Sequence, residues 1–132
     1  MDSLRVLIVD DEEELVSALV ERLRLRGFDA RGVTTGAEAL ADLERTGCDV
    51  VVLDVKMPGL GGLEVIKRIK RERPELEVVL LTGHGSAVSA EQGREAGAFE
   101  YLMKPVKIDE LAHILRSAGG GRGGLGRRWK DE

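Results

Sequence analysis

The chain has 132 residues, of which 42% are hydrophobic and 33% are charged, and its formal net charge at pH 7 is −4. This balance predicts one soluble globular domain and disfavours nucleic acid as a direct partner, and the single cysteine, Cys48, excludes a disulfide framework. No apolar run approaches the roughly 20 residues of a membrane span, and the N-terminus lacks a secretory cleavage site, so we expect a cytoplasmic protein without membrane insertion.

The first part of the chain alternates between short apolar runs and segments with helical spacing. Runs rich in β-branched residues predict strands, and apolar residues every three or four positions predict helices. Gly27 and Gly47 stand where glycines end helices, and Thr35 with Glu38 has capping-box spacing. In chain order we expect a strand Leu4–Val9, a helix Glu12–Arg26, an edge strand Asp29–Val33, a helix from Thr35 to about Thr46, and a central strand Val50–Leu53.

The second part continues the alternation and ends in a glycine-rich segment. A loop over 54–61 carries the turn residues Met57-Pro58-Gly59, and Gly97 closes a helix of weak apolar character. We expect a helix Gly62–Arg71, a strand Val78–Leu81, a helix Ser86–Ala96, a strand Phe99–Leu102 and a helix Lys107–Ser117. Residues 117–132 carry four basic side chains, two acidic ones and six glycines, which predicts a flexible tail after a domain at 1–116.

Five strands that alternate with helices predict a parallel sheet, because right-handed crossovers place helices on both faces. Five units are too few for a closed eight-stranded barrel. The sequence therefore predicts an α/β doubly wound sheet of the flavodoxin-like (βα)5 type with strand order 2-1-3-4-5.

Polar residues follow four of the predicted strands, where an open parallel sheet collects its functional groups. They are Asp10 and Asp11, then Asp54, Thr82 and Lys104. Adjacent carboxylates repel one another unless a cation is present, and an all-oxygen site suits Mg²⁺. A carboxylate beside Mg²⁺ and a lysine is a plausible nucleophile for a phosphoryl group. Taken singly, these acids are also compatible with helix or turn caps.

Residues 4–116 resemble the receiver domain of two-component response regulators, on the segments LIVDDEEEL, VVLDVKMPGLGG, LLTGHG and AFEYLMKP. The resemblance implies that Asp54 is the phospho-acceptor. It implies that Mg²⁺ is bound by Asp54, by Asp11 directly, by Asp10 through water, and by the backbone carbonyl of Lys56. His84 and the Lys56 side chain then stand at positions that tune the lifetime of the phosphoryl group.

The same resemblance assigns the remaining site residues. Thr82 and Lys104 match the hydroxyl and the lysine that contact the phosphoryl group, and Tyr101 matches the aromatic residue that switches with Thr82. The Lys104–Pro105 bond resembles the cis peptide of the family, a conformation that bonds to proline adopt at modest cost.

The implied function is a phosphorylation-controlled signalling module and not an enzyme acting on other molecules. A histidine kinase or phosphotransfer protein supplies the phosphoryl group, and the face formed by the fourth expected helix (Ser86–Ala96), the fifth strand (Phe99–Leu102) and the fifth helix (Lys107–Ser117) then acts on a protein partner. We expect a stand-alone receiver, as a monomer or a phosphorylation-linked homodimer. The alternatives are the receiver part of a longer regulator, a receiver that is never phosphorylated, and a haloacid-dehalogenase-like phosphohydrolase. In that last family the nucleophile follows the first strand, where this chain has Asp10.

Overall fold

The computed structural model describes residues 3–56, 61–83 and 90–120. Within these ranges, five parallel strands form one sheet in the order β2-β1-β3-β4-β5. The elements are β1 Arg5–Val9, α1 Glu13–Leu25, β2 Asp29–Val33, α2 Gly36–Arg45, β3 Val50–Asp54, α3 Gly62–Glu72, β4 Glu77–Thr82, α4 Ala90–Ala96, β5 Glu100–Met103 and α5 Ile108–Gly120. The predicted doubly wound fold and its strand order are confirmed, with β2 at an edge and β3 in the centre.

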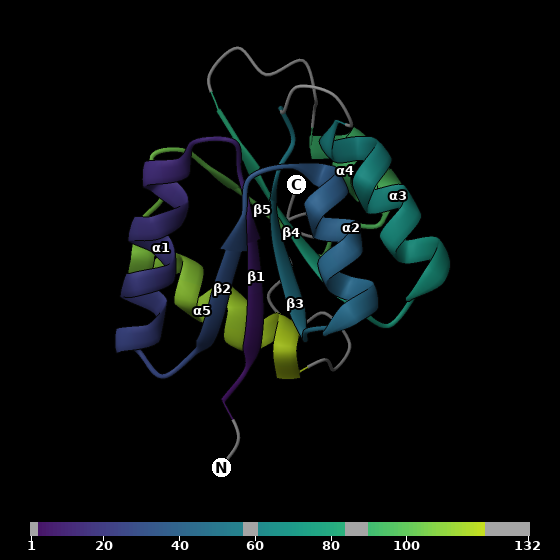
Figure 1. Cartoon of the computed structure of the whole chain (residues 1–132). Helices are drawn as coiled ribbons and strands as arrows, with labels where there is room; N and C mark the ends of the chain where they lie inside the picture. The colour runs from purple at the N-terminus through teal and green to yellow at the C-terminus, as the bar shows by residue number, and fades with distance from the viewer. Residues whose placement is uncertain (1–2, 57–60, 84–89, 121–132) are drawn as a thin grey trace.

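Helices cover both faces of the sheet, which explains why the central strands are continuously apolar. Figure 1 shows α1 and α5 on one face, and α2, α3 and α4 on the other. Successive side chains of a strand point to opposite faces. Accordingly, Val6 and Ile8 of β1 enter the core under α1 and α5, whereas Leu7 and Val9 enter the core under α2 and α3. Both cores hold the sheet rigid beneath the site at its carboxyl edge.

The capping residue and the helix-ending glycines predicted from the sequence agree with the backbone. Thr35 precedes α2 and its side chain accepts a hydrogen bond from the Glu38 backbone N–H at 3.0 Å, as a helix cap does. The Glu38 carboxylate accepts from the backbone N–H of Thr34, one residue earlier than a capping box requires. Gly27, Gly47 and Gly97 all have positive φ, the conformation that glycine adopts at helix ends.

Several boundaries differ from the prediction by one or more residues. Asp54 and Thr82 are the last residues of their strands instead of the first residues after them. β5 begins at Glu100 and not at Phe99 as predicted, because the first residue pair between β4 and β5 is Val79 with Glu100. Phe99 is nevertheless buried. The predicted helix Ser86–Ala96 is described only from Ala90, since 84–89 lie outside the described residues.

The last helix is longer than predicted, and the boundary placed near Ser117 falls inside it. Ala118 is buried against the core, and a Cβ on Gly119 would lie 2.4 Å from Leu4 Cδ2. Close packing on Leu4, the residue before β1, therefore extends the helix through glycines that have low helix propensity. Residues 121–132 of the predicted tail lie outside the described residues. Among the residues described, no helix has the length and apolar character to cross a bilayer.

Candidate functional site

Strand register brings the predicted polar residues to one edge of the sheet. Val9 of β1 pairs with Leu53 of β3, so that the next residues, Asp10 and Asp54, lie on neighbouring chain segments. On the other side, Thr82 ends β4, and its carbonyl accepts a hydrogen bond from the Lys104 backbone N–H at 2.7 Å. The carboxyl ends of four strands thus supply one site, as expected for an open parallel sheet.

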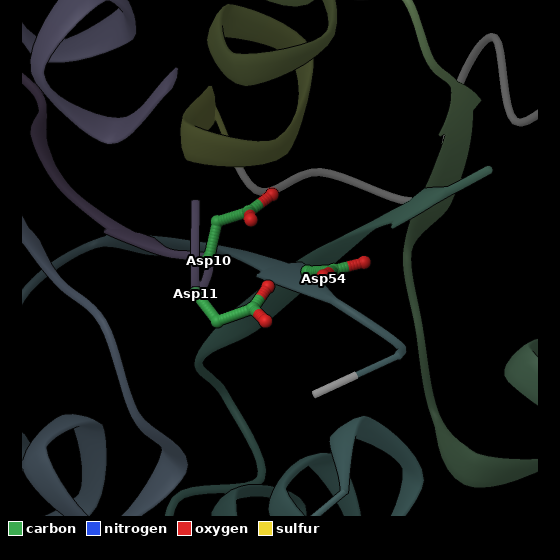
Figure 2. Close-up of side chains that lie close together, drawn as sticks. All are labelled: Asp10, Asp11 and Asp54. Carbon is green, nitrogen blue, oxygen red and sulfur yellow. The ribbon is translucent and has the colours of Figure 1, made fainter. Parts of the chain in front are cut away.

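Three carboxylates form the centre of this site. Asp10, Asp11 and Asp54 each offer an oxygen, and these oxygens all lie within 4.8 Å of one another. Figure 2 shows Asp10 and Asp11, which follow β1, beside Asp54 at the end of β3. Asp10 is fully buried, Asp54 is 4% exposed, and Asp11 is exposed. The cluster is therefore buried on one side and open to solvent on the other.

Lys104 is the cation of the site. Its Nζ lies 2.8 Å from Asp10 Oδ2 and 3.8 Å from Asp54 Oδ2. The contact between Lys104 and Asp10 is an ion pair. Nζ donates a hydrogen bond to Glu12 Oε1 at 2.8 Å. One ammonium group therefore faces several carboxylates, and the site keeps an excess of negative charge.

Burial and neighbouring charges shift the ionisation of the site. Burial raises the pKa of Asp54 to about 6, and the charge of Asp10 acts in the same direction, while the Lys56 backbone N–H opposes both. Burial alone would lower the pKa of Lys104, but its contacts with Asp10 and Glu12 outweigh burial and raise it. Above pH 6, Asp54 is thus mainly an anion beside a protonated lysine.

The backbone around Asp54 is held by a close approach of α3. Gly62 begins that helix, and its N–H donates to the Val55 carbonyl at 3.2 Å. A Cβ on Gly62 would lie 2.5 Å from Val55 Cα and 2.7 Å from the Asp54 carbonyl oxygen. Only glycine fits here without displacing backbone, so Gly62 contributes to the position of the Asp54 carboxylate.

The other residues expected at the site lie around this centre. The Lys56 N–H donates to Asp54 Oδ1 at 3.3 Å, and the Lys56 side chain is exposed. Thr82 is half-buried at the end of β4, and Tyr101 is half-buried in β5. The Lys104–Pro105 bond is cis, as the resemblance implies. His84 lies outside the described residues.

Glu12 is the residue of the site that sequence reasoning missed. The run of acids from Asp10 to Glu14 contains it, but the pattern predicted only the start of a helix there. The one available signal is its position directly after the acidic pair, because the residue that follows the pair stays close to the acidic cluster. A hollow of about 480 Å³ at the opposite edge, lined by Arg5, Cys48 and Asp49 among others, holds none of the site residues.

Comparison with known proteins identifies the family of this arrangement. A family model described as the response regulator receiver domain matches residues 6–116, which cover most of the chain. Within this match lie all the residues that form the acidic cluster and the lysine beside it.

Individual relatives agree with the family match. The chain is 41% identical over 112 residues to the sensory transduction protein RegX3 of Mycobacterium tuberculosis, covering 85% of this chain and 49% of RegX3. It is 34% identical to the C4-dicarboxylate transport transcriptional regulatory protein DctD of Rhizobium meliloti, covering 86% of this chain and 25% of DctD. A response regulator receiver domain protein from Clostridium thermocellum has a similar structure, with a TM-score of 0.84, 32% identity, and coverage of 89% of this chain and 94% of that one. The chain thus spans about half the length of RegX3 and a quarter of DctD.

Proposed function

Because the chain belongs to the response regulator receiver domain family, we propose that Asp54 accepts a phosphoryl group from a histidine kinase or a phosphotransfer protein. The observation that carries this proposal is the position of the Asp54 carboxylate, which lies beside two other carboxylates and 3.8 Å from the Lys104 ammonium. This combination suits a nucleophile for phosphorus, since it joins an anionic oxygen to groups that stabilise negative charge on the phosphoryl oxygens.

The acidic cluster fits a magnesium ion. Asp10, Asp11 and Asp54 provide oxygen ligands within 4.8 Å of one another, and the one ammonium beside them, Lys104 Nζ at 2.8 Å from Asp10 Oδ2, leaves the cluster with an excess of negative charge. Asp11 is exposed, so the cluster is reached from solvent. We propose that Asp11 and Asp54 bind Mg²⁺ directly, Asp10 through water, and Lys56 through its backbone carbonyl. When bound, Mg²⁺ would neutralise charge on the carboxylates and on the transferred phosphoryl group.

In the proposed reaction, an Asp54 carboxylate oxygen attacks the phosphorus of a phosphohistidine. A new O–P bond forms, the P–N bond breaks, and its electron pair returns to the imidazole nitrogen, which takes a proton. Lys104 holds a phosphoryl oxygen with its ammonium group, and the Thr82 hydroxyl donates a hydrogen bond to another. Hydrolysis of the product by water restores the Asp54 carboxylate and releases phosphate.

The proposed output is a change in the face formed by α4, β5 and α5. Thr82 ends β4, and Tyr101 lies in the neighbouring strand β5. Movement of the Thr82 hydroxyl toward the phosphoryl group frees space into which Tyr101 rotates. A local change of charge then biases a two-state surface that binds a protein partner. By its name, DctD is a transcriptional regulatory protein. Sequencing the gene beyond the codon for residue 132 distinguishes a stand-alone receiver from the receiver part of a longer regulator.

The experiment that tests this function maps the phosphoryl group. The protein is treated with acetyl phosphate and Mg²⁺, and the labelled residue is identified by mass spectrometry of peptides after reductive trapping. Label on Asp54, absent from Asp54→Asn and from samples with EDTA, supports the proposal. Label on Asp10, together with turnover of added phosphomonoesters, contradicts it and supports the phosphohydrolase alternative.

A further inference from the structure

Glu12 carries a carboxylate that the proposed phosphorylation chemistry does not use. Its Oε1 accepts a hydrogen bond from Lys104 Nζ at 2.8 Å, and Nζ lies equally far from Asp10 Oδ2. The distance from Nζ to Asp54 Oδ2 is 3.8 Å, which exceeds a hydrogen bond. The ammonium group of Lys104 is therefore bound to two carboxylates other than the expected acceptor.

The Glu12 side chain has no other structural task among the contacts described. Glu12 is the N-cap residue of α1, yet its side chain makes no capping hydrogen bond. Its backbone N–H donates to Asp10 Oδ1 at 2.9 Å, which fixes the residue beside the acidic cluster. The Glu12 side chain is 62% exposed, so its carboxylate can leave Lys104 and enter water at little cost in solvation.

We propose that Glu12 is a positioning residue that holds Lys104 in the unphosphorylated protein and competes with a phosphoryl group on Asp54 for the ammonium. This inference rests on the proposed function of Asp54. A phosphoryl oxygen displaces Glu12 Oε1 from Lys104 Nζ, and the Glu12 carboxylate is released at the start of α1. Breaking a half-exposed ion pair of this kind weakens the binding of a phosphoryl group by about twofold to fivefold.

Fluoroberyllate, a phosphoryl mimic, tests the competition without a covalent step. It is titrated into the 132-residue protein at saturating Mg²⁺, and binding is followed by NMR. For Glu12→Gln we expect a dissociation constant about twofold to fivefold lower than that of the wild type. Glu13→Gln removes the same charge from the neighbouring exposed residue and is the matched control, for which we expect the wild-type value.

Two further measurements separate the contact from the charge. Glu12→Asp keeps the charge but shortens the side chain by one methylene group, so we expect it to bind fluoroberyllate as tightly as Glu12→Gln. In the wild type, the carboxyl carbon resonance of Glu12 should move when fluoroberyllate binds, because its ion pair with Lys104 breaks. If Glu12 had only a structural role, Glu12→Asp would bind fluoroberyllate as the wild type does, and the Glu12 resonance would not move on binding.

The outcomes are distinguishable from a failure of the proposed function. Wild-type protein that binds fluoroberyllate, with Glu12→Gln binding no tighter, overturns the role of Glu12 and leaves Asp54 as the acceptor. Equal gains in Glu12→Gln and Glu13→Gln overturn it too, since the effect would then be general electrostatics. Wild-type protein that neither binds fluoroberyllate nor takes a phosphoryl group on Asp54 overturns the proposed function, and the inference with it.

Discussion

The charge of Asp54 should destabilise the metal-free fold, and replacing Asp54 by asparagine should therefore stabilise it. The folded-state pKa of Asp54 is raised from 3.8 to about 6, chiefly by burial and then by Asp10. A carboxyl whose folded pKa exceeds its unfolded pKa binds its proton more tightly in the native state, so stability falls as pH rises between these two values. Above pH 6 the full cost of the charged carboxylate is present.

The magnitude follows from the size of the shift. About two pKa units correspond to at most about 3 kcal/mol, and screening at the open rim of the sheet reduces this to about 1–2 kcal/mol. In EDTA at about pH 8, Asp54→Asn should raise the free energy of unfolding by that amount, measured by urea denaturation. The gain should shrink toward zero near pH 4, because Asp54 is then largely protonated in the wild type.

Asp42→Asn is the matched control, because Asp42 is buried as deeply as Asp54 but accepts hydrogen bonds from its cationic partner, whereas Lys104 Nζ lies 3.8 Å from Asp54. Asp42 is 5% exposed, and the Arg31 Nε lies 3.0 Å from its Oδ2. The same substitution there removes a charge-assisted contact and should destabilise the protein by about 1–3 kcal/mol. Saturating Mg²⁺ should stabilise the wild type far more than Asp54→Asn. If Asp54→Asn lowers stability in EDTA, or if its effect is the same near pH 4 and pH 8, the electrostatic account of the cluster is wrong.

Two other predictions concern packing and thiol chemistry. Gly62→Ala places a Cβ 2.5 Å from Val55 Cα, so we expect a loss of about 1–3 kcal/mol in stability and slower phosphorylation of Asp54, measured by urea denaturation and acetyl phosphate labelling. Gly61→Ala, which meets nothing within 4 Å, is its control, and equal losses in both variants would refute the packing argument. Burial raises the pKa of Cys48 to about 11 from 9.0, so its alkylation at about pH 8 should be at least about tenfold slower in native than in urea-unfolded protein, since a smaller thiolate fraction outweighs the greater nucleophilicity of each thiolate. A native rate equal to the unfolded rate would show that the pKa of the thiol is not raised in this way.

Most of the fold was predictable because its signals are local and periodic. β1 and β3 are buried on both faces, so they read as unbroken apolar runs, and the helices between them show one apolar face each. The errors arose where long-range packing overrides local preference. Gly119 and Gly120 continue α5 because the helix packs on Leu4, a contact more than a hundred residues away along the chain.

The site was predictable as a set of strand ends but not as a network of contacts. The order of the strands places Asp10 beside Asp54, because Val9 pairs with Leu53. Sequence alone does not tell which of several consecutive acids faces Lys104. The hydrogen bond to Glu12 depends on the turn of the chain between β1 and α1, where the Glu12 N–H binds Asp10.

The central claim is that Asp54 is the nucleophile of a magnesium-dependent phosphoryl transfer. The most direct measurement follows radiolabel from a phosphorylated histidine kinase to the wild type, to Asp54→Asn and to Asp11→Asn. The account predicts rapid uptake by the wild type with Mg²⁺, strongly slowed uptake by Asp11→Asn, and none by Asp54→Asn or in EDTA. Uptake by Asp54→Asn at the wild-type rate would contradict it.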